Sequence, residues 1–201
     1  YLLWRYYMRK TPDDPGELSS WLGLAILAIA THPILDFFTI YGTQLLAPFS
    51  NFRFYVPGVS VVDPVYTLTL LVAIAFGLWC PKKPKIYMTS AAIALSLTTT
   101  YLFYGIILNA KAEDIAKTQL AERGVTYQKL EAYNSIFQQY LRRVVVHRRD
   151  EVWLGYISTW KAHKISWIQH KKEQGPAAKA LLAHHRGQAF AWFTNQDYLI
   201  K

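Results

Sequence analysis

The sequence predicts a mainly α-helical membrane protein, with three or more transmembrane helices and a small α+β domain outside the membrane at its C-terminal end. Of its 201 residues, 52% are hydrophobic and 17% are charged, which excludes a disordered chain. Residues 1–108 hold 7 Lys and Arg with 5 Asp and Glu, whereas residues 109–201 hold 15 and 8. We therefore expect a transmembrane domain over 1–108 and a basic extramembrane domain over 109–201.

Three apolar stretches approach the roughly 20 residues that a helix needs to cross a hydrocarbon core of about 30 Å. They run over residues 18–38, 65–80 and 86–108. The second is the shortest, and Pro64 is suited to begin its helix because proline is tolerated in the first turn. The aromatic stretch from Tyr1 to Met8 is interpreted as the end of a fourth span, and we expect the chain to continue before Tyr1.

Cationic residues predict the orientation of these helices. Lys and Arg in short loops mark the cytoplasmic side of a membrane. If three spans alternate in direction, two groups of cations share one side, and residues 109–201 lie on the opposite, periplasmic side. These cations are Arg5, Arg9, Lys10, Lys82, Lys83 and Lys85.

His32 and Asp36 lie four residues apart near the end of the first apolar stretch. On a helix this spacing puts both side chains on one face, with about 5–6 Å between their β-carbons. Such a pair can bind a divalent cation, most simply Zn²⁺, which accepts nitrogen and oxygen ligands and activates water. The alternative is a His–Asp pair that only joins helices. Ionisable residues within a membrane are costly and usually functional, which favours the metal site.

Residues 39–64 are expected to form a re-entrant loop that folds back over the end of the first span. Gly42 permits a turn, and Pro48 interrupts regular structure. Such a loop brings Arg53 and Asp63, the candidate catalytic residues, to the face of the His–Asp pair. Arg53 would hold a phosphate with two hydrogen bonds, or lie as a cation at the level of the lipid headgroups. Asp63 would add a third metal ligand, or cap the second helix.

Residues 109–201 are predicted to contain both helices and strands. Residues 109–124 continue the third span as an amphipathic helix. Strands are expected over 141–147 and 152–159, which form a hairpin, and over 164–170. A helix over 177–185 precedes a last strand pair, 188–193 with 198–200.

The basic charge and the tryptophans of this domain suggest a partner. Stacking on single-stranded nucleic acid is one interpretation, but the sequence has no nucleic-acid-binding motif. Membrane lipids with anionic headgroups are the expected partner, and nucleic acid is not expected. The single cysteine, Cys80, excludes an internal disulfide and a zinc site built from cysteines.

The motifs around the His–Asp pair resemble those of a known family. They are His32-Pro33-x-Leu35-Asp36-x-x-Thr39-x-Tyr41-Gly42-Thr43, Pro48-Phe49-Ser50, Arg53-Phe54 and Asp63-Pro64-x-Tyr66-Thr67-Leu68. The pattern is similar to that of the LexA-regulated, YdjM-like metal-dependent hydrolases of the bacterial inner membrane, and it is densest over residues 31–70. The family's other signatures, Asp-x-x-Thr-His, Pro-Asp-x-Asp and His-Arg-Gly-x-Thr-His, are expected in a segment before Tyr1.

The resemblance implies a multi-pass inner-membrane protein with a metal site related to that of the zinc-dependent phospholipases C. It implies hydrolysis of a phosphoester, with a lipid-linked substrate as one version of this hypothesis. His32 and Asp36 match the family's His-x-x-x-Asp metal motif, and Asp63 matches its Asp-Pro motif. The rival hypothesis is a non-enzymatic membrane scaffold or stress-response protein in which the His–Asp pair is structural.

Overall fold

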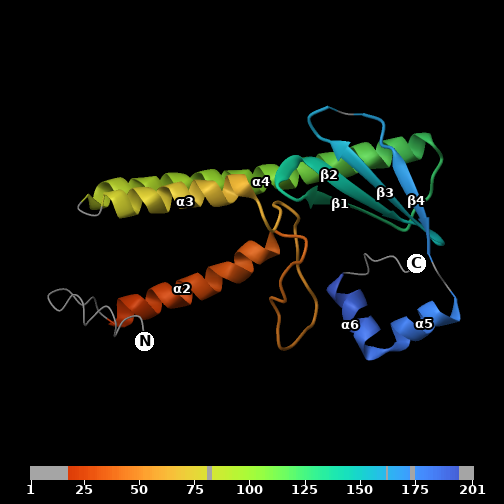
Figure 1. The fold of residues 1–201 in the computed structure, drawn as a ribbon, viewed down its shortest axis with the longest axis horizontal. Coiled ribbons are helices and arrows are strands. Elements are labelled where there is room, and N and C mark those ends of the chain that lie inside the picture. Colours follow the sequence, from red (N-terminus) through yellow and green to blue (C-terminus); the bar gives the residue numbers. More distant parts are fainter. Residues whose placement is uncertain (1–17, 81–82, 162, 173–174, 195–201) are drawn as a thin grey trace.

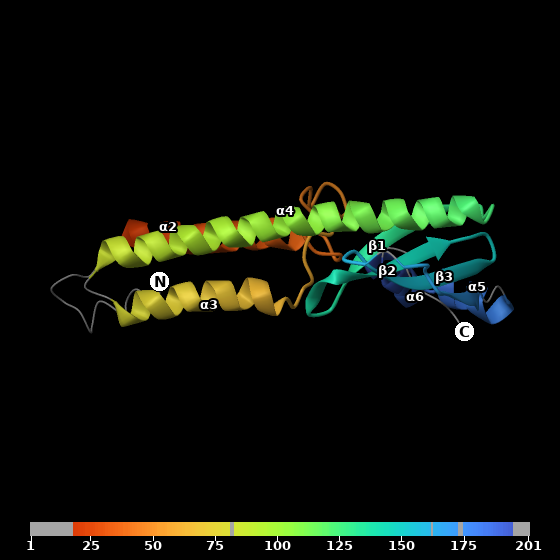
Figure 2. The same ribbon diagram turned by 90° about the horizontal axis from the view of Figure 1, so that it is seen from above.

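Helices and one antiparallel sheet follow each other along an elongated molecule (Figures 1 and 2). The computed structural model describes residues 18–80, 83–161, 163–172 and 175–194. The elements in this part of the chain are α2 (Leu18–Phe37), α3 (Pro64–Trp79), α4 (Pro84–Glu122), β1 (Lys129–Ser135), β2 (Gln138–His147), β3 (Glu151–Ser158), β4 (Trp167–Lys171), α5 (Pro176–Ala183) and α6 (His185–Phe193). The predicted span at Tyr1 to Met8 lies outside the described residues.

The predicted fold class, a mainly α membrane protein with three or more transmembrane helices, is wrong. In the described part of the chain, two helices are long and apolar enough to cross a membrane: α2 and the stretch Lys85–Glu122 of α4. The second predicted span, α3, has its N-cap at Asp63 and its C-cap at Cys80, which leaves 16 helical residues. At 1.5 Å per residue these cover about 24 Å, less than a hydrocarbon core of about 30 Å. Over the residues that the structure describes, five helices and a four-stranded sheet make a mixed fold.

The sheet has the order β1-β2-β3-β4 with every neighbouring pair antiparallel. One face packs on the last part of α4, where Ala112, Ala116 and Leu120 are fully buried. The two small alanine side chains let the helix approach the strands closely. The strand residues of this core are Ala132, Val144, Val146, Trp153 and Ile157.

Several local predictions for residues 109–201 can be compared with these elements. The hairpin strands are confirmed as β2 and β3, and the helix after residue 109 is confirmed as the continuation of α4. The predicted strand over 188–193 is wrong, because these residues belong to α6. The strand β1 was not predicted at all, and residues 198–200 lie outside the described part.

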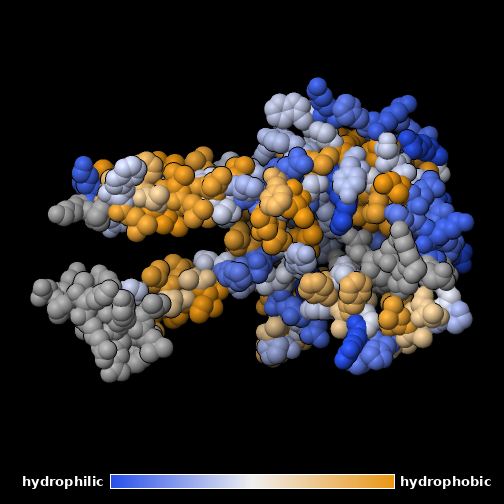
Figure 3. Space-filling model, in the orientation of Figure 1, coloured by the Kyte–Doolittle hydropathy of each residue, from blue (hydrophilic) through white to orange (hydrophobic). Residues whose placement is uncertain are grey.

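The surface changes character along the molecule (Figure 3). Hydrophobic side chains cover the helices at one end, and hydrophilic side chains gather over the sheet at the other end. On α4 the last exposed large apolar side chain is Ile107, and none of the α2 residues is buried. The apolar helix surfaces therefore stop where the sheet begins.

Candidate functional site

His32 and Asp36 face each other on the last turns of α2. His32 Nε2 lies 3.4 Å from Asp36 Oδ2, and the two side chains are 75% and 46% exposed. Pro33 lies within the same helix, and its carbonyl oxygen accepts a hydrogen bond from Thr43 Oγ1 at 2.9 Å. The following segment thus returns to the end of α2 and leaves the pair accessible.

Asp63 is almost completely buried, with 3% of its surface exposed. Its Oδ1 accepts a hydrogen bond from the Tyr66 backbone N–H at 3.0 Å, which makes it the N-cap of α3. The hydroxyl of Tyr101 on α4 donates to the same carboxylate, with its oxygen 3.0 Å from Oδ2 and 3.2 Å from Oδ1. Asp63 therefore caps one helix and joins it to the next.

Arg53 lies against the end of α6. Its Nη2 donates to the carbonyl oxygens of Trp192, at 2.5 Å, and Phe193, at 2.8 Å, and its Nη1 donates to that of Tyr41 at 3.2 Å. The guanidinium carbon also lies 4.5 Å from the centroid of the Trp192 ring. The last carbonyls of a helix lack partners within it and carry partial negative charge, so a cation is favoured there.

These four predicted site residues do not form one cluster. Among the residues that the structure describes, no three His, Cys, Asp or Glu side chains are grouped to hold a metal ion, and no hydrogen bond joins Asp63 or Arg53 to the pair. His32 and Asp36 are ligand types that suit zinc, but a zinc site takes three or four protein ligands. The pair therefore fits half of a site, and the metal and catalytic roles stay predictions.

A buried group of polar residues, which we call the polar junction, joins the 38–63 segment to α4 and β2. Gln139 Nε2 donates to the carbonyl oxygen of Gly58 at 3.0 Å. Arg142 Nη2 donates to the carbonyl oxygen of Gly105 at 2.8 Å and to Gln139 Oε1 at 2.9 Å. Arg142 has no exposed surface, and this burial lowers its pKa to about 10. Arg142 Nη1 also donates to Asn109 Oδ1 at 3.4 Å. The polar junction comprises Gly58, Gly105, Asn109, Gln139 and Arg142.

Two glycines let the backbones touch at this junction. A β-carbon added to Gly105 would lie 1.7 Å from the carbonyl oxygen of Gly58. The sequence-based predictions did not include this junction, although the sequence holds one signal. Arg142 is two residues before Val144 and four before Val146, so on a strand it shares their covered face.

A second polar cluster ties the same segment to β1. Glu131 Oε1 accepts a hydrogen bond from the Tyr55 hydroxyl at 2.5 Å, and Oε2 accepts from the Tyr133 hydroxyl at 2.7 Å and from Lys129 Nζ at 2.6 Å. Burial alone would raise the pKa of Glu131. The hydrogen bonds from Lys129, Tyr55 and Tyr133 outweigh this effect and lower the pKa.

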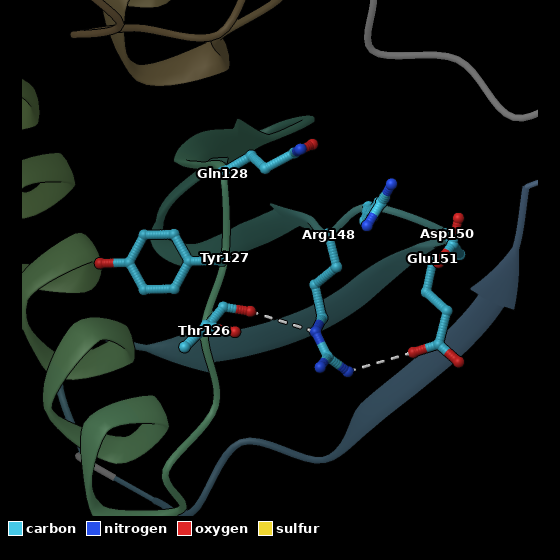
Figure 4. A pocket seen from close by; sticks show the side chains of 7 residues that line it. Thr126, Tyr127, Gln128, Arg148, Asp150 and Glu151 are labelled. Atoms are coloured by element: carbon cyan, nitrogen blue, oxygen red, sulfur yellow. Dashed lines mark hydrogen bonds and ion pairs between the residues drawn. The ribbon is translucent and has the colours of Figure 1, made fainter.

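A cavity of about 340 Å³ lies at the β2–β3 turn, at the other end of the sheet from the β1–β2 turn (Figure 4). The side chain of Arg148 lies between Thr126 and Glu151 in this view. Its Nε donates to the Thr126 carbonyl oxygen at 3.1 Å, and its Nη1 lies 3.3 Å from Glu151 Oε2. The cavity is lined by charges of both signs and has no connection with the predicted site residues.

Comparison with known proteins identifies the family of the chain. A family model described as YdjM inner membrane protein matches residues 1–110. This match covers more than half of the 201 residues and reaches the middle of α4. The family resemblance indicated by the motifs around His32 is thereby confirmed. Comparison with curated proteins and with solved structures gives no match.

Proposed function

We propose, from the premise that this chain belongs to the YdjM inner membrane protein family, that it is a membrane-anchored scaffold which holds a folded domain at one surface of the inner membrane. The observation that carries this proposal is the continuity of α4. Its 39 residues expose large apolar side chains as far as Ile107 and then bury Ala112, Ala116 and Leu120 under the sheet.

The length of the apolar part of α4 fits a bilayer. From Lys85 to Ile107 the helix rises about 33 Å, against a hydrocarbon core of about 30 Å. We call the sheet β1–β4, together with the last part of α4 on which it packs, the sheet domain. Because α4 continues into the core of this domain without a break, the domain has a fixed height above the membrane. The polar junction and the Glu131 cluster hold the 38–63 segment in place beside it.

We also propose a multi-pass arrangement in which α2 and α4 cross the membrane and the sheet domain is periplasmic. Between them α3 runs back beside α4, from Tyr101, which its cap Asp63 contacts, to the start of α4 near Tyr87. Lys83 and Lys85 at the start of α4 support this orientation, because such cations are retained on the cytoplasmic side. Fusion of alkaline phosphatase to the C-terminus should give an active enzyme, and fusion of a fluorescent protein that folds only in the cytoplasm should stay dark. The reverse pattern would contradict the orientation.

A second candidate function is metal-dependent hydrolysis of a phosphoester. In one version of this proposal the phosphoester is linked to a lipid. The accessible His32–Asp36 pair favours this function, because these two side chains would hold a zinc ion together with ligands from outside the described residues. A bound Zn²⁺ supplies a Lewis acid that lowers the pKa of its water to about 7. The scaffold has no need of metal.

Metal content separates the two candidates. If the pair binds metal, purified protein from zinc-supplemented cells should carry stoichiometric zinc, and His32→Ala and Asp36→Ala should each lose most of it while still inserting into membranes. His163→Ala, which removes an exposed histidine near the sheet, is the matched control and should keep the metal. Equal zinc in all four proteins, or zinc in none, would leave the scaffold as the function of the chain.

A further inference from the structure

We propose that the sheet domain makes its own contact with the bilayer, through exposed apolar and aromatic side chains gathered at one end of the sheet. We call this group the apolar end; it consists of Ile136, Phe137, Tyr140 and Trp160. The inference rests on the proposed membrane anchoring. It adds a surface through which the sheet domain itself contacts lipid, besides the helices that anchor it.

The strand pairing brings these residues together. Ile136 and Phe137 form the turn between β1 and β2 and are 66% and 62% exposed. Leu141 on β2 pairs with Ser158 on β3, so Tyr140 and Trp160, which lie just beyond this pair, are at the same end of the sheet. Their rings are in contact, with centroids 5.2 Å apart, and Trp160 is 72% exposed.

The opposite end of the sheet has the reverse composition. There the β2–β3 turn carries the charged run Arg148, Arg149, Asp150 and Glu151. Exposed large apolar side chains on one end and charges on the other give the sheet a polarity along its strands. This polarity has the same direction as that of the whole molecule, in which the apolar helices lie beyond the apolar end (Figure 3).

Two contacts fix the height of the apolar end relative to the helices. The Phe137 backbone N–H donates to the carbonyl oxygen of Val62 at 3.4 Å, and Val62 lies one residue before the cap of α3. Both ribbon views place the β1–β2 turn beside the start of α3 (Figures 1 and 2). The Tyr140 ring lies against that of Tyr104 on α4, with centroids 6.4 Å apart. From Lys85 to Tyr104 the helix rises about 29 Å, close to one hydrocarbon thickness.

The side chains at this height are those that favour a membrane interface. Tyr and Trp are enriched where the hydrocarbon meets the headgroups. Lys111 lies two turns beyond Tyr104 on α4 and donates through Nζ to the carbonyl oxygen of Thr159 at 3.1 Å, and Lys161 directly follows Trp160. Along the axis of α4, apolar side chains are therefore followed by aromatic and then by cationic ones. This order is the same as that of the hydrocarbon core, the interface and the anionic headgroups of a bilayer. The occupant of the apolar end is thus the bilayer that already surrounds α4.

Spin labels can measure the depth of this end. A Cys80→Ser background leaves no native thiol, and Ile136→Cys, Arg149→Cys and Leu95→Cys then carry one label each. All three positions are exposed, so the fold should be retained. The labelled full chain is reconstituted into vesicles of phosphatidylethanolamine and phosphatidylglycerol, and its collisions with oxygen, which concentrates in lipid, are compared with those with a water-soluble nickel chelate.

Labels at 136 and 95 should collide more with oxygen than with nickel, and the label at 149, at the charged end, should show the reverse. If 136 behaves like 149 while 95 is in lipid, the apolar end does not touch the bilayer, and the anchoring proposal still stands. If 95 also behaves like 149, the anchoring proposal fails as well. A label at 136 that is immobilised and shielded from both reagents would mean that a second copy or another protein covers this end, which would also overturn the inference.

Discussion

The two parts of α4 share one backbone geometry and have opposite surroundings. In the part up to Ile107, large apolar side chains such as Ile93 and Leu95 are more than half exposed, at 55% and 60%. In the part after it, Ala112 and Ala116 have no exposed surface. The first part carries one charged side chain, Lys85, whereas the second part carries five and turns its apolar face to the sheet.

The difference has an energetic consequence. The sheet removes the second part of α4 from water, so each apolar side chain there contributes to the folding of the domain, at about 25 cal/mol per Å² of buried area. The exposed side chains of the first part have no such partner in the protein. If lipid covers them, as we propose, their truncation should change the stability of the folded domain very little, because lipid also covers them after the domain unfolds.

The largest effect is expected from Leu120→Ala. Leu120 is fully buried between α4 and the sheet, and its truncation should lower the free energy of unfolding by about 2–5 kcal/mol, since it leaves a cavity in the core. Leu95→Ala, the same change on the exposed part of the same helix, should cost less than about 0.5 kcal/mol. Urea unfolding of the full chain in detergent, followed by tryptophan fluorescence, measures both. Equal losses would remove the distinction between the two parts.

Gly105→Ala tests the boundary between the two parts. Its new β-carbon would meet the Gly58 carbonyl oxygen, so the backbones must separate, at a cost of about 1–3 kcal/mol. Gly23→Ala on α2 is the matched control, because nothing lies within 4 Å of its added β-carbon. In the Gly105 variant the amides of Gly58 and Val59, which donate to the Phe38 carbonyl oxygen, should also exchange hydrogen faster. Unchanged exchange would mean that this contact does not hold the segment.

The sequence predicted what depends on neighbouring residues. β2 and β3 follow from β-branched and aromatic runs, and the two alternatives for Asp63 included the helix cap that the structure shows. β1 was missed because its sequence, Lys-Leu-Glu-Ala-Tyr-Asn-Ser, lacks β-branched residues. The run before Phe193 alternates aromatic residues as a strand does, but it forms a helix.

What the sequence could not predict depends on distant backbone atoms. Arg53 binds carbonyl oxygens that lie 139 and 140 residues further along the chain. Arg142 binds a carbonyl oxygen on α4, 37 residues before it. Any residue type carries such an oxygen, so no motif marks these partners. A charged side chain predicts that some partner exists and does not identify it.

Glu131→Gln should have a smaller effect, which depends on pH. Glu131 lies on β1, in the sheet that covers the second part of α4. The lowered pKa of Glu131 means that the folded chain holds this carboxylate charged more strongly than the unfolded chain does. Its contribution, about 1 kcal/mol, is complete above its ordinary pKa of 4.5 and is lost as the pH falls through the lower folded value.

We therefore expect the free energy of unfolding, measured with urea between pH 3 and 7, to fall more steeply in acid for the natural protein than for Glu131→Gln. The difference between the two proteins should become small towards pH 3. Glu122→Gln removes a carboxylate at the exposed end of α4 and is the control for net charge. Parallel curves for Glu131→Gln and the natural protein would show that the charge of Glu131 adds nothing to stability and would contradict its lowered pKa.

The smallest effect is expected from Asp63→Asn, on the membrane side of the boundary. Asn caps a helix about as well as Asp, and its side-chain oxygen can still accept from the Tyr66 N–H or the Tyr101 hydroxyl, so the loss should be about 0.5 kcal/mol. Asp63→Ala removes the cap and leaves the Tyr101 hydroxyl without its acceptor, which should cost about 1–3 kcal/mol. Zinc content is measured on the same samples. If Asp63 only joins α3 to α4, Asp63→Asn keeps the metal content of the natural protein, whereas loss of metal with unchanged stability would make Asp63 a ligand.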